Sequence, residues 1–189
     1  MYLCAFMRVV FLGNHTVGVT ALRALLETVD VVGVVAHPPD PEDGTRYDSV
    51  HEFAESRGVP VTRARGKDQA VADFIRTSAP DLLWVTDYRY LLPTDLIEST
   101  LRGAVNLPPS LLPRYRGRAP INWAILHGES EIGLTAHFIT EGMDSGDIID
   151  QEVVSLTAKD DVGDALDYLM PLYDALTRRV AIRFAAGPV

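Results

Sequence analysis

The sequence contains a single cysteine, Cys4, among its 189 residues. One cysteine excludes an internal disulfide, and we therefore expect a protein of the reducing cytoplasm. Long apolar runs are also missing. None approaches the ~18 residues that a membrane span needs, so no membrane partner is expected. The apolar start, MYLCAF, lacks the basic residues of a signal peptide, and these six residues are either an alternative initiation segment or an appended strand.

Basic residues are few. The 17 lysines and arginines stand against 26 aspartates and glutamates, which gives a net charge of −9 and a pI of about 4.9. Such a balance repels nucleic acid unless a local basic patch overrides it, so no nucleic-acid partner is expected. The one dense basic group near the central motifs is Arg114, Arg116 and Arg118. These side chains either face solvent from a loop or contact a phosphate or carboxylate of a substrate.

The glycine pattern of dinucleotide-binding proteins is absent as well. Residues 13–18 read GNHTVG and do not match Gly-x-Gly-x-x-Gly. Classical NAD binding is therefore not predicted. We expect no metal site either.

Apolar strands alternate with amphipathic helices through the first half of the chain. The composition, 47% hydrophobic and 23% charged, fits one globular domain over residues 1–189. Because helices separate the strands, the pattern predicts an α/β fold with a Rossmann-like, doubly wound and mostly parallel sheet. Strands are expected at 8–13, 31–36, 59–62 and 81–86, and helices at 17–28, 49–57 and 68–77. Thr16 is the expected cap of the first helix, and His37 to Gly44 is the expected loop.

Polar groups, turn formers and apolar strands converge most densely between Val105 and Asp150. Asn106 ends a short apolar run, prolines and glycines follow, and residues 119–127 resemble a helix. An apolar run over 134–139 contains His137, and a Gly- and Asp-rich loop with Asp144 comes after it. Polar residues at strand ends are the usual site residues of an open α/β sheet.

The last part of the chain predicts a strand at 151–156 and a helix at 162–185. Asp160 and Asp161 lie where a helix N-terminus favours anions. The apolar positions of this helix pack either within the chain or against a second copy. A homodimer formed through the helix is plausible, because homodimers are the commonest soluble assembly.

Several motifs of the central stretch resemble the formyltransferase family. They are Asn106, the run SLLPRYRG at 110–117, the pair Ala119-Pro120 and the run GMDSGDII at 142–149. The resemblance covers roughly residues 7–156 and implies the formyltransferase fold, with 10-formyltetrahydrofolate as co-substrate and an amine as acceptor. It places the whole chain in a single catalytic domain, without the C-terminal extension domain that methionyl-tRNA formyltransferases carry. That difference, with the acidic balance, argues against tRNA as the acceptor.

Catalytic roles follow from the resemblance and from the chemistry of formyl transfer. A tetrahedral oxyanion needs an uncharged donor, and the amide of Asn106 suits it. Asp144 matches the family carboxylate that orients an imidazole, and His137 matches a second histidine of the glycinamide ribonucleotide branch. Their alternative roles are a loop-capping Asn, a turn Asp and a strand His. The family pattern Asn-x-His becomes Asn106-Leu107-Pro108 here, and proline has neither a side-chain donor nor an N–H.

The resemblance also implies binding residues. Two loops correspond to those that hold folate in the family, one with Arg89, Tyr90, Leu91 and Leu92, the other with Ile139, Thr140 and Glu141, next to Asp144. The leucines and Ile139 either wall a flat ring or belong to the core. The acceptor side is expected to include Asn14, His15 and Ser110.

Three functions remain open from the sequence. The first is an N-formyltransferase that modifies a small amine, such as an amino sugar or a specialised metabolite. The second is a folate site that performs slow hydrolysis or a different acyl-type transfer. The third is a binding module that holds folate or a partner protein without turnover. Pro108 favours the second and third, whereas the retained Asn106 and Asp144 favour the first.

Overall fold

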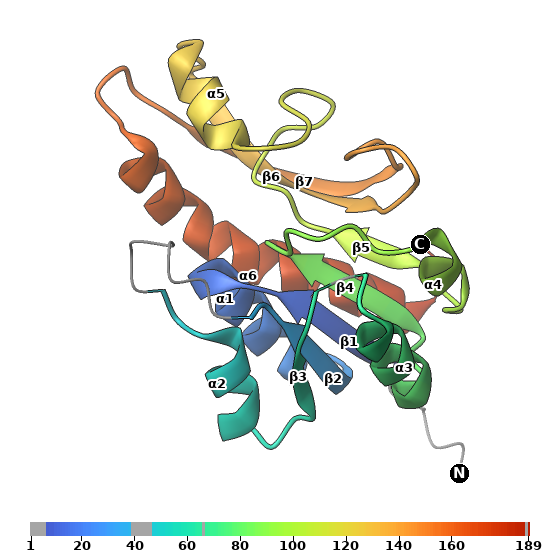
Figure 1. The fold of residues 1–189 in the computed structure, drawn as a ribbon. Coiled ribbons are helices and arrows are strands. Elements are labelled where there is room, and N and C mark those ends of the chain that lie inside the picture. Colours follow the sequence, from blue (N-terminus) through green and yellow to red (C-terminus); the bar gives the residue numbers. More distant parts are fainter. Residues whose placement is uncertain (1–6, 39–46, 66, 188) are drawn as a thin grey trace.

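A computed structural model describes residues 7–38, 47–65, 67–187 and 189. Residues 1–6 and 39–46, which include the initial segment and most of the predicted loop from His37 to Gly44, lie outside the described residues. The elements fold around one seven-stranded sheet (Figure 1).

The strand order of the sheet is β3-β2-β1-β4-β5-β6-β7. Its strands are β1 (Arg8–Gly13), β2 (Asp30–Ala36), β3 (Val61–Arg63), β4 (Leu82–Thr86), β5 (Ala104–Asn106), β6 (Glu131–Phe138) and β7 (Ile148–Ser155). The first five run parallel, as the alternation of strands and helices predicts. The strand order reverses between β1 and β4, which is where ligands bind in open α/β sheets.

The last two strands run antiparallel, β6 to β5 and β7 to β6. Their sequences predicted strands but not this reversal. The short connection between β6 and β7 has no room for a crossover helix, so the two strands pair directly. The loop that joins them contains Asp144.

Helices flank the sheet, and all but the five-residue α4 have seven residues or more. They are α1 (His15–Leu26), α2 (Val50–Ser56), α3 (Gln69–Ser78), α4 (Thr94–Glu98), α5 (Pro120–Leu126) and α6 (Val162–Ala186). Residues of β1 alternate between the two faces: Val9 and Phe11 pack with α1, α2, α5 and α6, whereas Val10 and Leu12 pack with α3 and α4. The mostly parallel sheet is therefore covered on both faces, which confirms the predicted fold class.

Helix α6 packs within the chain rather than standing away from it. A capping box starts the helix, because Asp161 accepts from the Asp164 N–H and Asp164 accepts from the Asp161 N–H. Buried positions recur along it, among them Leu169, Tyr173 and Phe184. They pack in the core cluster shared with α1 and β6. Of the two predicted alternatives, packing within the chain therefore describes these buried positions.

Some local predictions were wrong in detail. Helix α1 begins at His15, so Thr16 lies inside its first turn and Asn14 takes the N-cap position. The Thr16 hydroxyl instead accepts from the Asp48 N–H at 3.3 Å. The five-residue helix α4 was not predicted, since one short turn after Pro93 leaves no clear period. Across the described ranges, no helix is both long and apolar enough to cross a membrane.

Candidate active site

Asn106 and His137 meet because their strands pair. Asn106 ends β5, and the antiparallel register sets it directly opposite His137 of β6. The Asn106 Nδ2 atom lies 3.5 Å from His137 Nε2. The His137 side chain is 2% exposed, so its ring is held almost entirely inside the protein.

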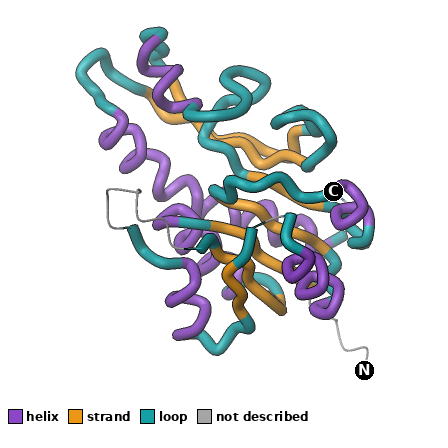
Figure 2. The backbone as a smooth tube through the Cα atoms, viewed as in Figure 1, coloured by secondary structure: helices purple, strands orange, loops and turns teal. Residues whose placement is uncertain are grey.

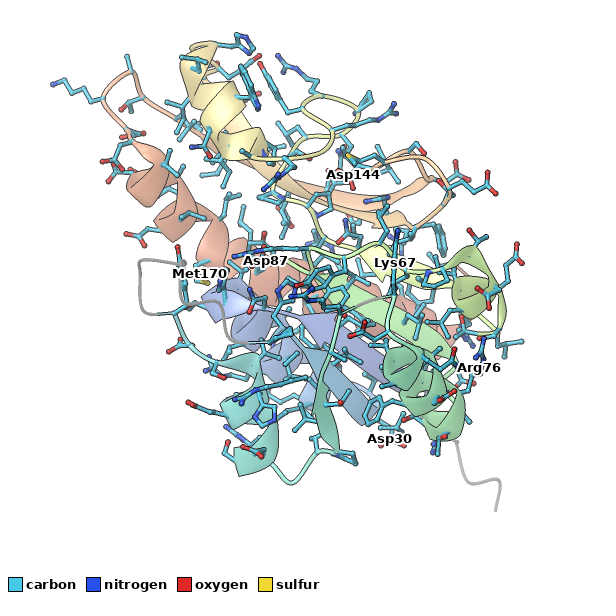
Figure 3. All side chains as sticks on the ribbon, in the orientation of Figure 1. Asp30, Lys67, Arg76, Asp87, Asp144 and Met170 are labelled. Carbon is cyan, nitrogen blue, oxygen red and sulfur yellow. The ribbon has the colours of Figure 1, made fainter. Side chains whose placement is uncertain are left out.

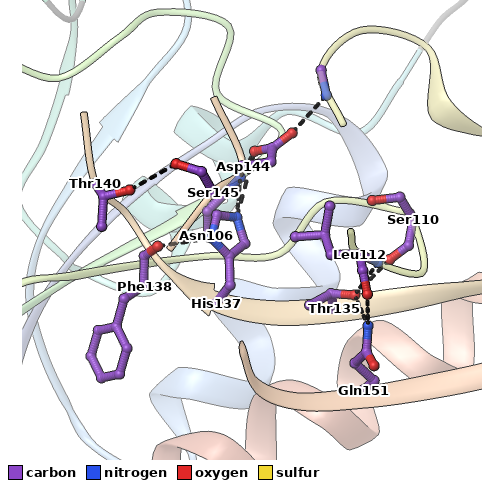
Figure 4. A network of polar contacts seen from close by, with 11 residues as sticks. Asn106, Ser110, Leu112, Thr135, His137, Phe138, Thr140, Asp144, Ser145 and Gln151 are labelled. Atoms are coloured by element: carbon purple, nitrogen blue, oxygen red, sulfur yellow. Dashed lines mark hydrogen bonds and ion pairs between the residues drawn. The ribbon is translucent and has the colours of Figure 1, made fainter. Parts of the chain in front are cut away.

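Asp144 joins this pair from the loop between β6 and β7 (Figure 4). Its Oδ1 atom accepts from Asn106 Nδ2 at 3.3 Å and lies 3.5 Å from His137 Nε2. Its Oδ2 atom accepts from the Gly117 N–H at 2.9 Å, across from the loop that follows β5. These two loops, far apart in the sequence, therefore lie side by side, as the backbone tube in Figure 2 shows. We call Asn106, His137 and Asp144 the central triad.

The partners of His137 fix its proton on one nitrogen. Its Nδ1 lies 2.8 Å from the carbonyl oxygen of Phe138, which only accepts, so Nδ1 carries a proton. Nε2 then has two states. Unprotonated, it accepts from the Asn106 amide; protonated, it forms an ion pair with Asp144. Because both states have a partner in place, neither requires the ring to move.

Asp144 is held as an anion. Burial is the largest single influence on the pKa of its carboxyl and acts to raise it. The hydrogen bond with His137, the Gly117 N–H, the charge of His137 and the Asn106 amide act in the opposite direction. Together they outweigh burial, so the pKa of Asp144 lies below its ordinary value.

A second polar network secures the SLLP turn beneath the triad. Thr135, on β6, donates through its hydroxyl to the Ser110 carbonyl at 2.6 Å and accepts from the Leu112 N–H at 3.2 Å. Gln151, opposite Thr135 on β7, donates both to that hydroxyl and to the Leu112 carbonyl. Figure 4 shows these contacts beside the central triad. The turn is thus fixed to the antiparallel hairpin that carries His137.

Pro108 and Ser110 are buried parts of this turn. The Pro108 carbonyl accepts from the N–H groups of Ser110 and Thr135. Ser110 is 4% exposed, and it lines a small cavity with residues of α5 and β6 such as Ala124 and Ile132. That cavity is lined by none of the triad residues, so substrate binding by Ser110 stays a prediction.

The two loops expected to hold folate have mixed surroundings. Leu92 and Ile139 pack against the core beneath the α3 and α4 face, whereas Leu91 is 68% exposed. Tyr90 stacks on His37 with ring centroids 4.9 Å apart. In the second loop Thr140 shares a hydrogen bond with Ser145, and Glu141 is exposed.

Residues at the carboxyl ends of β1 and β4 form a further polar group. His15 Nδ1 lies 2.8 Å from Asp87 Oδ2, and His15 Nε2 lies 3.5 Å from the Arg89 guanidinium. Asn14, predicted beside His15, is the N-cap residue of α1. Asp87 was missed in the sequence, although its place directly after a buried strand was the signal that drew attention to Asn106.

Of the basic group Arg114, Arg116 and Arg118, one side chain forms an ion pair within the protein. Arg114 bonds both carboxylate oxygens of Glu129, and Tyr115 donates to the same carboxylate. Arg116 and Arg118 are exposed. Within the described part of the chain, no three His, Cys, Asp or Glu side chains are grouped to hold a metal ion.

The geometry can be set beside known proteins. Residues 7–170 match the family model described as formyl transferase. The chain belongs to the formyl transferase family. The fold and the motifs of the central stretch therefore have a common origin with those of enzymes that transfer formyl groups.

Individual relatives agree with this membership. A methionyl-tRNA formyltransferase of Pelotomaculum thermopropionicum is 37% identical over 171 residues, which cover 88% of this chain and 55% of that protein. One from Myxococcus xanthus is 42% identical over 146 residues, covering 75% and 47%. The crystal structure of glycinamide ribonucleotide transformylase 1 from Symbiobacterium toebii superposes with a TM-score of 0.81 at 25% identity, covering 96% of this chain and 89% of that one. This chain spans about half the length of the curated formyltransferases it matches.

Proposed function

We propose that this protein transfers the formyl group of 10-formyltetrahydrofolate to an amine. The observation that carries the proposal is the central triad: Asn106, His137 and Asp144 come from two strands and a loop and lie within 3.5 Å of one another. Formyl transfer needs an oxyanion donor, a proton route and a fixed carboxylate, and the triad offers one group for each.

Asn106 is the proposed oxyanion donor. Its two amide contacts, at 3.3 and 3.5 Å, are long for hydrogen bonds, so one amide hydrogen can turn to a substrate oxygen at small cost. An uncharged amide is weakly hydrated compared with a cation. It is therefore suited to stabilising charge that develops only in the transition state.

His137 and Asp144 are the proposed proton route. Asp144 stabilises the protonated ring, and the fixed Nδ1–H leaves Nε2 as the atom that exchanges the proton. This arrangement supplies an imidazole at the triad although Pro108 occupies the position of the family's histidine. The contacts of the His137 ring with Asn106 and Asp144 support formyl transfer over the hydrolytic and binding-only alternatives.

The two predicted loops fit the formyl donor in part. Leu92 and Ile139 are apolar, partly buried and backed by the core, which suits one side of a flat ring. Backbone groups of residues 88–93 and 139–143 would hold its polar edge, with Arg89, Tyr90, Leu91, Thr140 and Glu141 alongside. The donor, when bound, supplies the activated formyl carbon.

For the acceptor we propose a small-molecule amine, such as an amino sugar or a specialised metabolite. The net charge of −9 supports an acceptor without a long phosphate backbone. The second candidate is methionyl-tRNA, which the 37% identity to a methionyl-tRNA formyltransferase favours.

The test is formyl transfer by the purified chain from 10-formyltetrahydrofolate to methionyl-tRNA, glycinamide ribonucleotide and a nucleotide-linked amino sugar. Transfer to a small amine supports the first acceptor class, and transfer to tRNA alone selects the second. Calorimetric titration with a stable analogue of the donor measures binding separately. If the purified chain neither bound the analogue nor transferred a formyl group to any of these acceptors, the proposal would be overturned.

Asp144→Asn tests the triad directly. We expect the variant to stay folded and to lose turnover by about 10²–10⁴-fold, because an amide cannot balance the charge of a protonated His137. Asp147→Asn, in the same loop, is the matched control and should keep activity. Equal activity in the wild-type protein and Asp144→Asn would rule out the role of Asp144.

A further inference from the structure

Met143 is an exposed methionine in the loop between β6 and β7. Three of the four methionines of the sequence, Met7, Met143 and Met170, lie in the described ranges. Met7 is 6% exposed, and Met170 is partly buried, with its sulfur accepting from the Thr20 hydroxyl at 3.3 Å. Met143 is 60% exposed. A reagent in solution therefore reaches the Met143 side chain more readily than the other two.

The Met143 side chain lies against Gly117, where the loop after β6 meets the loop after β5. A methyl group added to the Gly117 Cα atom would lie 2.9 Å from the Met143 Sδ atom, closer than Cβ atoms come to other atoms in proteins. The sulfur thus fills the space that a side chain at position 117 would need. Gly117 also has a φ of 90°, which favours glycine. The apolar contact of the thioether therefore depends on a glycine at this position.

Gly117 connects this contact to the central triad. Its N–H donates to Asp144 Oδ2 at 2.9 Å, and Asp144 directly follows Met143 in the chain. Asp144 has a φ of 46°, which non-glycine residues seldom adopt, so its position depends on the contacts around it. Figure 3 labels Asp144 on the loop after β6, whereas Met170 belongs to α6. The Met143 sulfur and the Asp144 carboxylate thus share one neighbour, Gly117.

We infer that Met143 is a modification site at which oxidation by hydrogen peroxide switches formyl transfer off, an inference that rests on the proposed function. In this step the O–O bond of the peroxide breaks and an S–O bond forms. The sulfur loses an electron pair and becomes a sulfoxide, and the peroxide is reduced to water. A methionine sulfoxide reductase reverses the change: its thiols are oxidised to a disulfide, and the sulfoxide oxygen leaves as water.

The sulfoxide no longer fits the contact with Gly117. It is larger by one oxygen atom, and it is polar, so water solvates it better than the glycine surface does. The added oxygen is also a hydrogen-bond acceptor next to Gly117. Separation of the two loops and capture of the Gly117 N–H by the sulfoxide have the same result, because Asp144 loses its backbone donor. The proton route through His137 and Asp144 is then no longer held in place.

Peroxide treatment of the Cys4→Ser protein is the sharpest test, because this substitution removes the one thiol that also reacts. Peptide mapping by mass spectrometry should find the sulfoxide at Met143 before Met7 and Met170. With the acceptor that supports transfer, we expect kcat to fall by about 10²-fold, the loss that a misplacement of about 1 Å causes. Methionine sulfoxide reductases for the two sulfoxide epimers should restore it.

Two variants in the same background separate Met143 from the other methionines. Met143→Leu keeps an apolar side chain of similar volume that peroxide does not oxidise. Its kcat after treatment should therefore equal that of its own untreated sample. Met170→Leu is the matched control, and peroxide should lower its kcat as it does in the Cys4→Ser protein.

A second readout does not depend on turnover. Burial is the largest influence on the pKa of the Asp144 carboxyl and raises it, whereas the hydrogen bond with His137 and the Gly117 N–H lower it. Because oxidation removes the Gly117 donor, it should raise this pKa in the Cys4→Ser protein but not in Met143→Leu. NMR titration of the carboxyl carbon measures the change.

A Met143 sulfoxide that leaves either kcat or the pKa of Asp144 unchanged would overturn this inference alone. So would an equal loss of activity in Met143→Leu, or peroxide that oxidises Met7 or Met170 first. Absence of transfer in the untreated wild-type protein would overturn the proposed function and this inference with it.

Discussion

Pro108 is the residue that most alters the expected chemistry of the site. It stands two positions after Asn106, where the family pattern has a histidine, and it donates no hydrogen bond. Its carbonyl, however, accepts from the N–H groups of Ser110 and Thr135, so it belongs to the turn that supports the triad. Since His137 already contacts both Asn106 and Asp144, the site has an imidazole without residue 108.

Pro108→His is therefore expected to raise turnover by less than about 10-fold, or to lower it. A positioned acid–base group contributes about 10²–10⁴-fold to the rate. Because His137 already supplies an imidazole, we expect a second one to add little. Steady-state kinetics with the working acceptor measure the change. Pro109→His, one position further on, controls for the loss of a proline from the turn. A rise of 10²-fold or more would mean that His137 does not serve as the proton carrier.

At the scale of elements, the N-cap of helix α6 contributes to the stability of a long segment. Asp161 accepts from the N–H groups of Gly163 and Asp164 at 2.7 and 3.1 Å, which satisfies two donors that a helix start leaves unpaired. Helix α6 also contains Pro171, so its hydrogen-bond ladder is already interrupted within the helix.

Asp161→Ala should lower the free energy of unfolding by about 1 kcal/mol, the usual cost of removing a side-chain N-cap. Urea denaturation followed by circular dichroism measures it. Asp167→Ala, an exposed position inside the same helix, removes one carboxylate without touching the cap and should cost less. Equal losses in the two variants would assign the effect to net charge rather than to capping.

At the scale of the whole molecule, α6 is attached to the edge of the sheet through charged groups. Arg179 donates to Asp150 of β7 at 2.7 Å, and Arg183 lies 3.6 Å from the same carboxylate. The hydrogen bond from Arg179 is the main reason that the pKa of Asp150 lies below its ordinary value. Burial opposes this shift, whereas the Gln151 N–H and the two arginine charges add to it.

Acid should therefore destabilise the fold. A carboxyl whose pKa is lower in the folded than in the unfolded chain stabilises the fold above its unfolded pKa, about 3.9, and loses that contribution as the pH falls through the folded value. Asp150 and Asp144 both contribute in this sense. We expect Asp150→Asn to be about 1 kcal/mol less stable than wild type at pH 7, and the difference to shrink as the pH falls below the unfolded pKa of about 3.9 and through the lower pKa of the folded chain.

Urea unfolding of both proteins between pH 7 and pH 3 measures this difference, with Asp167→Asn as the control that keeps both carboxylates. A difference that persists unchanged at pH 3 would contradict the assignment to ionisation and would point to packing instead.

Local sequence determined most of the elements. Continuous apolar runs and period-3.6 apolar patterns, with prolines and glycines between them, predicted β1, β2 and β4 and the helices beside them, because these signals need only near neighbours in the chain. They also placed Asn106 and Asp144 in the proposed site, and the motifs around them carried the family resemblance. The start of α1 and the existence of α4 escaped, since both depend on backbone hydrogen bonds that no local pattern specifies.

Tertiary structure alone decided which polar groups meet. The reversal of β6 sets His137 opposite Asn106, and the return of the next loop sets Asp144 against both. The pairing of His15 with Asp87 likewise follows from the adjacency of β1 and β4. Strand order and register arise from the burial of whole faces of the sheet, a property of all seven strands together. The sequence by itself determined what kinds of groups the site has, and the packed sheet determined which of them touch.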